Sequence, residues 1–94
     1  MSKKNYQFTA TIQAAKQGGA FVVFPYDIRQ EFGKGRVKVQ ASFDGEPYIG
    51  SIVNMGFKDE NGNVCYILGI LKAIREKIAK QVGDSVIVTV QELV

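Results

Sequence analysis

The clearest structural signal in this sequence lies at residues 37–45, which read Val37-Lys38-Val39-Gln40-Ala41-Ser42-Phe43-Asp44-Gly45. Apolar and polar residues alternate from Val37 to Phe43, which is typical of a strand with one buried face. Asp44-Gly45 favours a two-residue hairpin turn, because glycine readily adopts the positive φ that such a turn requires. The stretch therefore predicts a strand, a tight turn and a return strand over residues 47–54.

Further strands are expected on both sides of this hairpin. In residues 6–14 every second residue is apolar, which is the pattern of a half-buried strand. Residues 20–24 and 64–70 are largely apolar runs of strand length, and the second of them follows another hairpin signal at Asn61-Gly62. Alternating valines predict a last strand over residues 86–90.

Two helices are predicted between these strands. Pro25 is expected at the first position of a short helix, where its missing N–H would have no helical partner. Asp27 then lies in the first turn, at the positive end of the helix dipole. The apolar residues Leu71, Ile74, Ile78 and Val82 recur at helical spacing and predict an amphipathic helix over residues 71–82.

The two predicted helices belong to similar segments. Ile28-Arg29, Gly33 and the strand beginning at Val37 have counterparts in Ile74-Arg75, Gly83 and the strand beginning at Val86. Each segment is a strand, a short helix and a second strand, and neither could bury its apolar face alone. We therefore expect a mainly β protein with two short helices, made of two strand–helix–strand halves that close one core. Its length suits a single domain, residues 1–94.

Composition narrows the classes of function. The 94 residues carry a net charge of +3, which permits binding to a polyanion but is too small to indicate it. No apolar stretch has the length of a membrane helix, and none follows Lys3 and Lys4 as a secretory signal requires. Cys65 is the only cysteine, so no internal disulfide can form, and we expect a cytoplasmic protein.

The absence of histidine argues against most enzymatic chemistry. It removes the commonest general base and metal ligand, and it excludes serine–histidine and cysteine–histidine pairs within one chain. Cys65 lies in a predicted strand, where a buried structural thiol is the expected role. The carboxylates do not cluster, and the glycines do not form a phosphate-binding loop. We expect no enzymatic activity, no cofactor and no metal site.

The order of short motifs along the chain resembles a known family. The motifs are Phe24-Pro25-Tyr26-Asp27-Ile28, Phe32-Gly33-Lys34-Gly35-Arg36-Val37-Lys38-Val39, Asp44-Gly45-Glu46-Pro47-Tyr48, Ser51, Leu71-Lys72-Ala73-Ile74-Arg75 and Gly83-Asp84-Ser85-Val86. Together they resemble domain-of-unknown-function family 1905 and, distantly, AbrB-type regulators and MazE-type antitoxins. The resemblance covers residues 6–90 and departs from the family in lacking a tryptophan near Phe21. It implies a double-split β-barrel, a pseudobarrel capped by short helices, and no established activity.

Two sets of residues are candidate binding sites. The resemblance implies a small anionic-ligand pocket formed by Tyr48, Ser51, Lys72 and Arg75; the alternative for Arg75, as for Arg29, is a structural arginine bonded to the turns. Charge and spacing indicate a second site, a phosphate-binding stripe, because Lys34, Arg36 and Lys38 alternate along one strand and share a face. The alternative for this stripe is a solvated face or a protected sheet edge.

Two functions remain open from the sequence. The first is a small non-enzymatic binding domain that takes a small ligand or a partner protein at the helix-capped end of the barrel. The alternative is an AbrB-like nucleic-acid-binding protein, by analogy of fold. Against the analogy, Arg36 and Lys38 correspond to Ser85 and Ile87 in the second half, so the basic stripe is not doubled within one chain. A homodimer would restore it, but the sequence does not distinguish a monomer from a homodimer.

Overall fold

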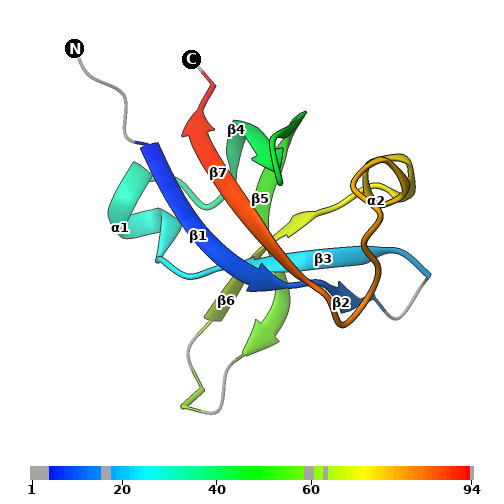
Figure 1. The fold of residues 1–94 in the computed structure, drawn as a ribbon. Coiled ribbons are helices and arrows are strands. Elements are labelled where there is room, and N and C mark those ends of the chain that lie inside the picture. The colour runs from blue at the N-terminus through cyan, green and yellow to red at the C-terminus, as the bar shows by residue number, and fades with distance from the viewer. Residues whose placement is uncertain (1–4, 16–17, 59–60, 63, 94) are drawn as a thin grey trace.

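The computed structural model describes residues 5–15, 18–58, 61–62 and 64–93. These ranges form a mainly β structure with two short helices (Figure 1). In chain order the elements are β1 (Asn5–Thr11), β2 (Gln13–Ala14), β3 (Ala20–Phe24), α1 (Ile28–Phe32), β4 (Val37–Phe43), β5 (Glu46–Lys58), β6 (Val64–Gly69), α2 (Lys72–Lys77) and β7 (Ser85–Glu92).

All strands belong to one antiparallel sheet with the order β1-β7-β4-β5-β6-β3-β2. The two ends of this order, β1 and β2, are consecutive in the chain and are separated only by Ile12. The sheet therefore curls until one N-terminal segment borders both of its ends, which gives the barrel-like shape in Figure 1. In that view α1 and α2 lie on opposite sides of the curled sheet.

Ile12 holds this junction in place. Its side chain is buried in the core, and its N–H donates to the carbonyl of Asp84 at 2.9 Å. Its own carbonyl accepts from the N–H of Gly83, also at 2.9 Å. Both backbone groups at the strand interruption are thus satisfied by the turn that precedes β7, as a buried backbone requires.

The strand pairings repeat within the chain. The segment β3–α1–β4 matches β6–α2–β7, because β3 pairs with β6 and β4 pairs with β7. β5 pairs with both β4 and β6, in the same way that the β1–β2 segment pairs with both β7 and β3. Exchanging the two halves therefore leaves the set of pairings unchanged. Both long segments are also interrupted, β1–β2 at Ile12 and β5 by a register shift between Asn54 and Lys58.

The core follows the predicted alternation. In β4 the side chains of Val37, Val39, Ala41 and Phe43 are buried, and they alternate with polar residues that are exposed or half-buried. The buried residues of the other elements complete one cluster: Ile12, Ala20, Val22, Phe24, Ile28, Ile52, Tyr66, Leu68, Ile70, Ile74, Val86, Val88 and Val90. Among the described residues no charged side chain is buried.

The hairpin turn between β4 and β5 has the predicted geometry. Asp44 has a φ of 50° and Gly45 a φ of 89°, so both central residues are left-handed, as a type I′ turn requires. The return strand is longer than expected, since β5 begins at Glu46 and runs to Lys58. Extra length is possible because β5 pairs first with β4 and then with β6.

The first helix begins later than the sequence analysis predicts. α1 starts at Ile28, so Pro25 is not its first residue, and that prediction was wrong. Asp27 is the N-cap instead of a first-turn residue, and its carboxylate accepts from the N–H of Arg29 at 2.9 Å. A side chain that satisfies a free helical N–H fixes the helix start more strongly than the fixed φ of a proline.

The second helix ends earlier than predicted. α2 stops at Lys77, and the expected helix to Val82 was wrong. Ala79 has a φ of 56° and donates its N–H to Glu76, while the N–H of Lys80 reaches back to the carbonyl of Arg75. This pair of bonds is a Schellman motif, with Ala79 at the left-handed position that glycine usually occupies.

Replacing Ala79 by glycine should therefore stabilise the protein. A left-handed conformation is strained for alanine and not for glycine, so Ala79→Gly should raise the free energy of unfolding by about 0.5–1 kcal/mol. Urea denaturation measures this change. Ala73→Gly is the matched control, because Ala73 lies within α2, where glycine should lower stability. A loss of stability in both variants would contradict the assignment of Ala79 to a strained left-handed position.

Candidate functional site

The outer face of β1, β7 and β4 forms a polar surface. Inward residues of these strands build the core, so the residues between them lie on the face away from it. Strand register aligns these outer residues in two rows. One row is Asn5, Gln91 and Gln40, and the next is Gln7, Thr89 and Ser42.

A groove of about 380 Å³ lies over these rows. Figure 1 shows the strands that carry it, with β1 and β7 side by side. Its lining residues are Asn5, Tyr6, Gln7, Gln40, Ala41, Ser42, Pro47, Thr89, Val90 and Gln91. The groove thus presents four carboxamides and two hydroxyls, and the hydroxyls of Ser42 and Thr89 are 2.5 Å apart in a hydrogen bond.

The groove is electrically neutral. None of the described residues that line it is Asp, Glu, Lys or Arg. Glu92 follows Gln91 in β7, but its carboxylate accepts from Lys34 at 2.7 Å, so these two charges offset each other. Lys38, two residues before Gln40, is the nearest outward cation along β4. Chemically, the groove offers hydrogen-bond donors and acceptors without a field that selects for either sign of charge.

Tyr6 forms part of the groove wall and is fixed from behind. Its hydroxyl donates to Glu31 in α1 at 2.6 Å, and its ring packs edge-on against Phe24 and Phe32. Burial raises the pKa of Tyr6 to about 12, and the hydrogen bond to the Glu31 carboxylate acts in the same direction. The phenol is therefore a neutral donor already engaged with Glu31.

The predicted phosphate-binding stripe is only partly aligned. β4 begins at Val37, so Lys34 and Arg36 precede the regular strand, and Lys38 alone of the three lies within it. All three side chains are exposed, but Lys34 is paired with Glu92. Lys3 and Lys4 lie outside the described residues.

The predicted anionic-ligand residues are distributed over both sides of the sheet. Tyr48 lies on the core side of β5, where its ring contacts Phe43 and covers Gly50 so closely that a Cβ there would clash. Ser51 lies opposite Lys38 on the outer face, because it is three positions after Tyr48 and side chains alternate along a strand.

The other two members of that predicted site belong to α2. Lys72 is its exposed first residue, and Arg75 is half-buried. The Nε of Arg75 is buried and has no hydrogen-bond partner in the part of the chain that the structure describes. No measured contact joins Lys72 or Arg75 to Tyr48 or Ser51, so the four-residue pocket stays a prediction.

A second hollow, of about 530 Å³, lies where β3 leads into α1 and β6 begins. Its lining is partly polar and partly apolar and includes the exposed Tyr26 and Val64. Asp27, the one charged residue among the described lining residues, already caps α1. Cys65 lies at its wall and is half-buried, less enclosed than the buried thiol predicted from the sequence. The polar side chains among its described lining residues are Tyr26, Asp27, Cys65 and Tyr66, and none of them is basic.

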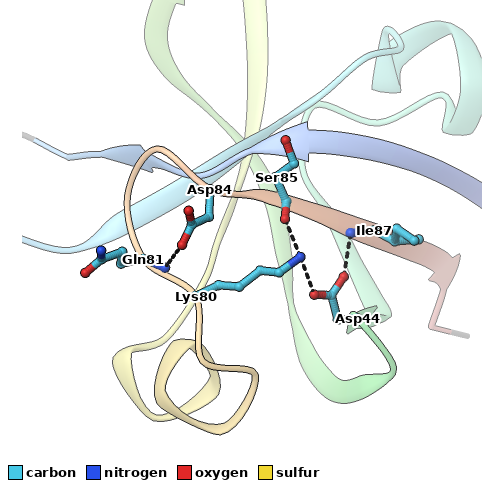
Figure 2. A network of polar contacts seen from close by, with 6 residues as sticks. All are labelled: Asp44, Lys80, Gln81, Asp84, Ser85 and Ile87. Carbon is cyan, nitrogen blue, oxygen red and sulfur yellow. Dashed lines mark hydrogen bonds and ion pairs between the residues drawn. The ribbon is translucent and has the colours of Figure 1, made fainter.

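A polar network joins the β4–β5 turn to the α2–β7 connection (Figure 2). The Lys80 ammonium contacts Asp44 at 2.7 Å and donates to the carbonyl of Ser85. The second Asp44 oxygen accepts from the N–H of Ile87 at 2.8 Å. The hydrogen bond from Lys80, with that from Ile87, lowers the pKa of Asp44. These groups satisfy one another, which indicates a structural network.

Asp84 stabilises the turn that precedes β7. Its carboxylate accepts from the N–H of Gln81 at 2.9 Å, as Figure 2 also shows. Across the described ranges no three His, Cys, Asp or Glu side chains lie close enough to hold a metal ion. Neither described helix has the length and apolar character needed to cross a membrane.

The neutral groove was missed at the sequence level. The signal for it is present, because most outward positions of three predicted strands carry amides and hydroxyls, with Lys38 and Ile87 as exceptions. The alternation of polar and apolar residues does not show that β1 pairs with β7 or that β7 pairs with β4. That pairing aligns residues from both ends of the chain.

Comparison with known proteins identifies one family. A family model described as "Domain of unknown function (DUF1905)" matches residues 8–90. The matched range contains both described helices. It also contains all of the described strands except the first residues of β1 and the last residues of β7. No curated protein matches the chain.

The Asp44–Lys80 pair should contribute stability that acid removes. Folding lowers the pKa of Asp44, so its contribution is present above the ordinary value near 4 and is lost as pH falls through the folded value. Asp44→Asn, which retains an acceptor and tolerates positive φ, should cost about 0.5–1 kcal/mol at pH 7 and progressively less below pH 4. Urea unfolding across pH measures both.

The matched control for that pair is Glu46→Gln, which breaks the Lys77–Glu46 ion pair on the same hairpin. That contact is longer, at 3.1 Å, and its lysine is 69% exposed against 32% for Lys80. It should therefore change stability less than Asp44→Asn. An equal loss of unfolding free energy in both variants would contradict a stabilising role for the Asp44–Lys80 network. So would a loss for Asp44→Asn that does not become smaller in acid.

Tyr6 should make the fold sensitive to alkali. Because folding raises its pKa to about 12, the native state holds the phenol proton more tightly than the unfolded chain does. Stability should be full below pH 10 and fall between pH 10 and 12, by at most about 1.4 kcal/mol per pH unit. Urea unfolding of the natural protein and of Tyr6→Phe measures this. An identical alkaline loss in both proteins would show that Tyr6 is not the source.

Proposed function

The chain belongs to the DUF1905 family, and we propose that it is a small non-enzymatic binding domain whose ligand is a small, uncharged, polar molecule. The observation that carries this proposal is the neutral groove over β1, β7 and β4. Its volume lies in the range typical of ligand sites, roughly 300–1,000 Å³. Its amides and hydroxyls are the kind of convergent polar groups that orient a ligand.

The neutrality of the groove favours an uncharged ligand. A buried charge in a protein is usually paired, an anion with a cationic side chain and a cation with a carboxylate. The described lining offers neither, and the adjacent Lys34 and Glu92 are paired with each other. A neutral ligand exchanges its hydrogen bonds with water for bonds to the amides at little electrostatic cost.

A partner protein fits the groove less well. Interfaces between proteins depend on a few large anchors, most often Trp, Tyr or Arg, seated in the partner's pockets. Among the described lining residues only Pro47 supplies exposed apolar surface, because Ala41 and Val90 are buried in the core and the one tyrosine is engaged with Glu31. These features support a small ligand over a partner protein.

The alternative, AbrB-like nucleic-acid binding, depends on Arg36 and Lys38. Both are exposed, and Lys38 lies beyond one end of the groove. Nucleic-acid affinity requires several phosphate contacts, and the pairing of Lys34 with Glu92 reduces the positive charge available here. Charge therefore supports this alternative less than it supports a neutral ligand.

The proposal includes the finer fold and the location of the protein. In a double-split β-barrel the halves β3–α1–β4 and β6–α2–β7 would be related by a two-fold axis. The strand pairing supports this fold, because β3 pairs with its counterpart β6 and β4 pairs with its counterpart β7. A cytoplasmic location fits a chain whose one cysteine, Cys65, forms no internal disulfide.

Nuclear magnetic resonance on isotope-labelled protein tests the proposed function. The side-chain NH₂ signals of Asn5, Gln7, Gln40 and Gln91 report directly on the groove. Probes would be neutral nucleosides, acetylated amino-acid amides and sugars, with inorganic phosphate, citrate and a short DNA duplex as charged counterparts. We expect a neutral probe to shift the groove signals, and Gln40→Ala with Gln91→Ala to weaken its binding at least tenfold.

Gln30→Ala is the matched control, since Gln30 is an exposed glutamine of α1 outside the groove. It should leave binding unchanged. Binding of the DNA duplex alone, weakening steeply with salt and shifting Arg36 and Lys38, would overturn the neutral-ligand proposal in favour of nucleic acid. A response confined to phosphate or citrate at Lys72 and Arg75 would instead favour the anionic pocket.

A further inference from the structure

We propose that the ligand class of the groove is a neutral polyhydroxyl compound, that is, an uncharged carbohydrate. This inference rests on the proposed function and specifies its ligand. It is drawn from the donors and acceptors of the groove, from the strand pairing that arranges them, and from the ligand classes that the same surface disfavours.

The groove requires a ligand whose groups both donate and accept. Each carboxamide presents two N–H donors beside a carbonyl acceptor, and each hydroxyl is a donor and an acceptor. The groove holds four carboxamides and two hydroxyls. Every hydroxyl of a sugar likewise donates and accepts, so a sugar satisfies both functions of each amide without leaving one unpaired.

Strand pairing arranges these groups as a regular array. Asn5, Gln91 and Gln40 lie in one row across the strands, and Gln7, Thr89 and Ser42 lie in the next. Neighbouring strands are about 4.8 Å apart, and alternate residues of one strand are about 6.8 Å apart. Such an array suits a ligand with polar groups distributed over its whole surface, as in a sugar, better than a ligand with one polar end.

The array also has apolar contact surface. Pro47 is exposed at the β5 side of the groove, whereas the side chains of Ala41 and Val90 are buried in the core beneath it. A sugar ring carries C–H groups between its hydroxyls, and these can pack on such a small apolar surface while the hydroxyls reach the amides. The combination accounts for both kinds of lining residue.

An extended peptide is disfavoured by the backbone. Peptides that add to a sheet use the free N–H and C=O groups of an edge strand. Here β7 lies between β1 and β4, and β4 lies between β7 and β5, so the backbone of these two strands is paired on both sides. β1 ends the sheet order and pairs only with β7, so it is the one groove strand to which a peptide could add. Over β7 and β4 the groove contacts its ligand through side chains.

Nucleobases are disfavoured by the absence of a stacking surface. Proteins that hold unpaired bases stack them on exposed aromatic rings. The one aromatic residue of the described lining, Tyr6, packs its ring against Phe24 and Phe32. Amides alone can bond to the edge of a base, but they leave its faces without a partner.

The experiment titrates labelled protein with neutral trisaccharides of glucose and of N-acetylglucosamine. The comparison probes are glucose 6-phosphate, adenosine and an acetylated alanine amide. We expect the trisaccharides to shift the NH₂ signals of Gln40 and Gln91, with a dissociation constant on the order of 1 mM that salt does not change. Gln40→Leu and Gln91→Leu should each weaken binding about tenfold, and Gln30→Leu should not.

The outcomes separate the inference from the proposed function. Binding of adenosine or of the amide at the groove, without binding of the trisaccharides, overturns the carbohydrate assignment and leaves the neutral-ligand function standing. Binding of glucose 6-phosphate alone, lost at high salt, overturns both. The absence of binding by every neutral probe to a protein with an unchanged thermal midpoint also overturns both.

Discussion

The whole sheet depends on the interruption of its first strand at Ile12. Residues before Ile12 pair with β7 and residues after it pair with β3, so one segment closes both ends of the sheet order. The junction is stable because the Ile12 side chain is buried and both of its backbone polar groups bond to the turn at Gly83 and Asp84. Without this junction, β7 and β3 would present unpaired edges to solvent, which promotes aggregation.

Because the sheet curls on itself, its inner and outer faces have different roles. The inner face is filled by one apolar cluster, which supplies the main stabilising free energy. The outer face of β1, β7 and β4 carries the neutral groove, with Lys38 and the exposed Ile87 outside its lining. The register that aligns Val88 with Phe43 in the core also aligns Thr89 with Ser42 in the groove. The core therefore positions the candidate site.

Local capping and long-range contacts together set the helix boundaries. Asp27 begins α1 through a bond that could be anticipated from residue type, but Pro25 is the more conspicuous signal and misleads the prediction. At α2 the apolar spacing continues to Val82, and yet the helix ends at Lys77 because the chain must turn toward β7. Lys80 then meets Asp44 and Ser85, contacts that favour the turn over a longer helix. These partners are distant in sequence, so helical periodicity carries no information about them.

The sequence by itself determined the class of the fold, the β4–β5 hairpin and the family. Alternation, turn dipeptides and motif order are local properties, and they suffice to place strands, to orient Val37 and Phe43 inward and to recognise DUF1905. Only the tertiary structure decided which outer residues are neighbours. Gln40, Gln91 and Asn5 form one row because strands from the two ends of the chain pair. Pairing is a long-range choice set by burial and chain closure, and no short stretch of sequence encodes it.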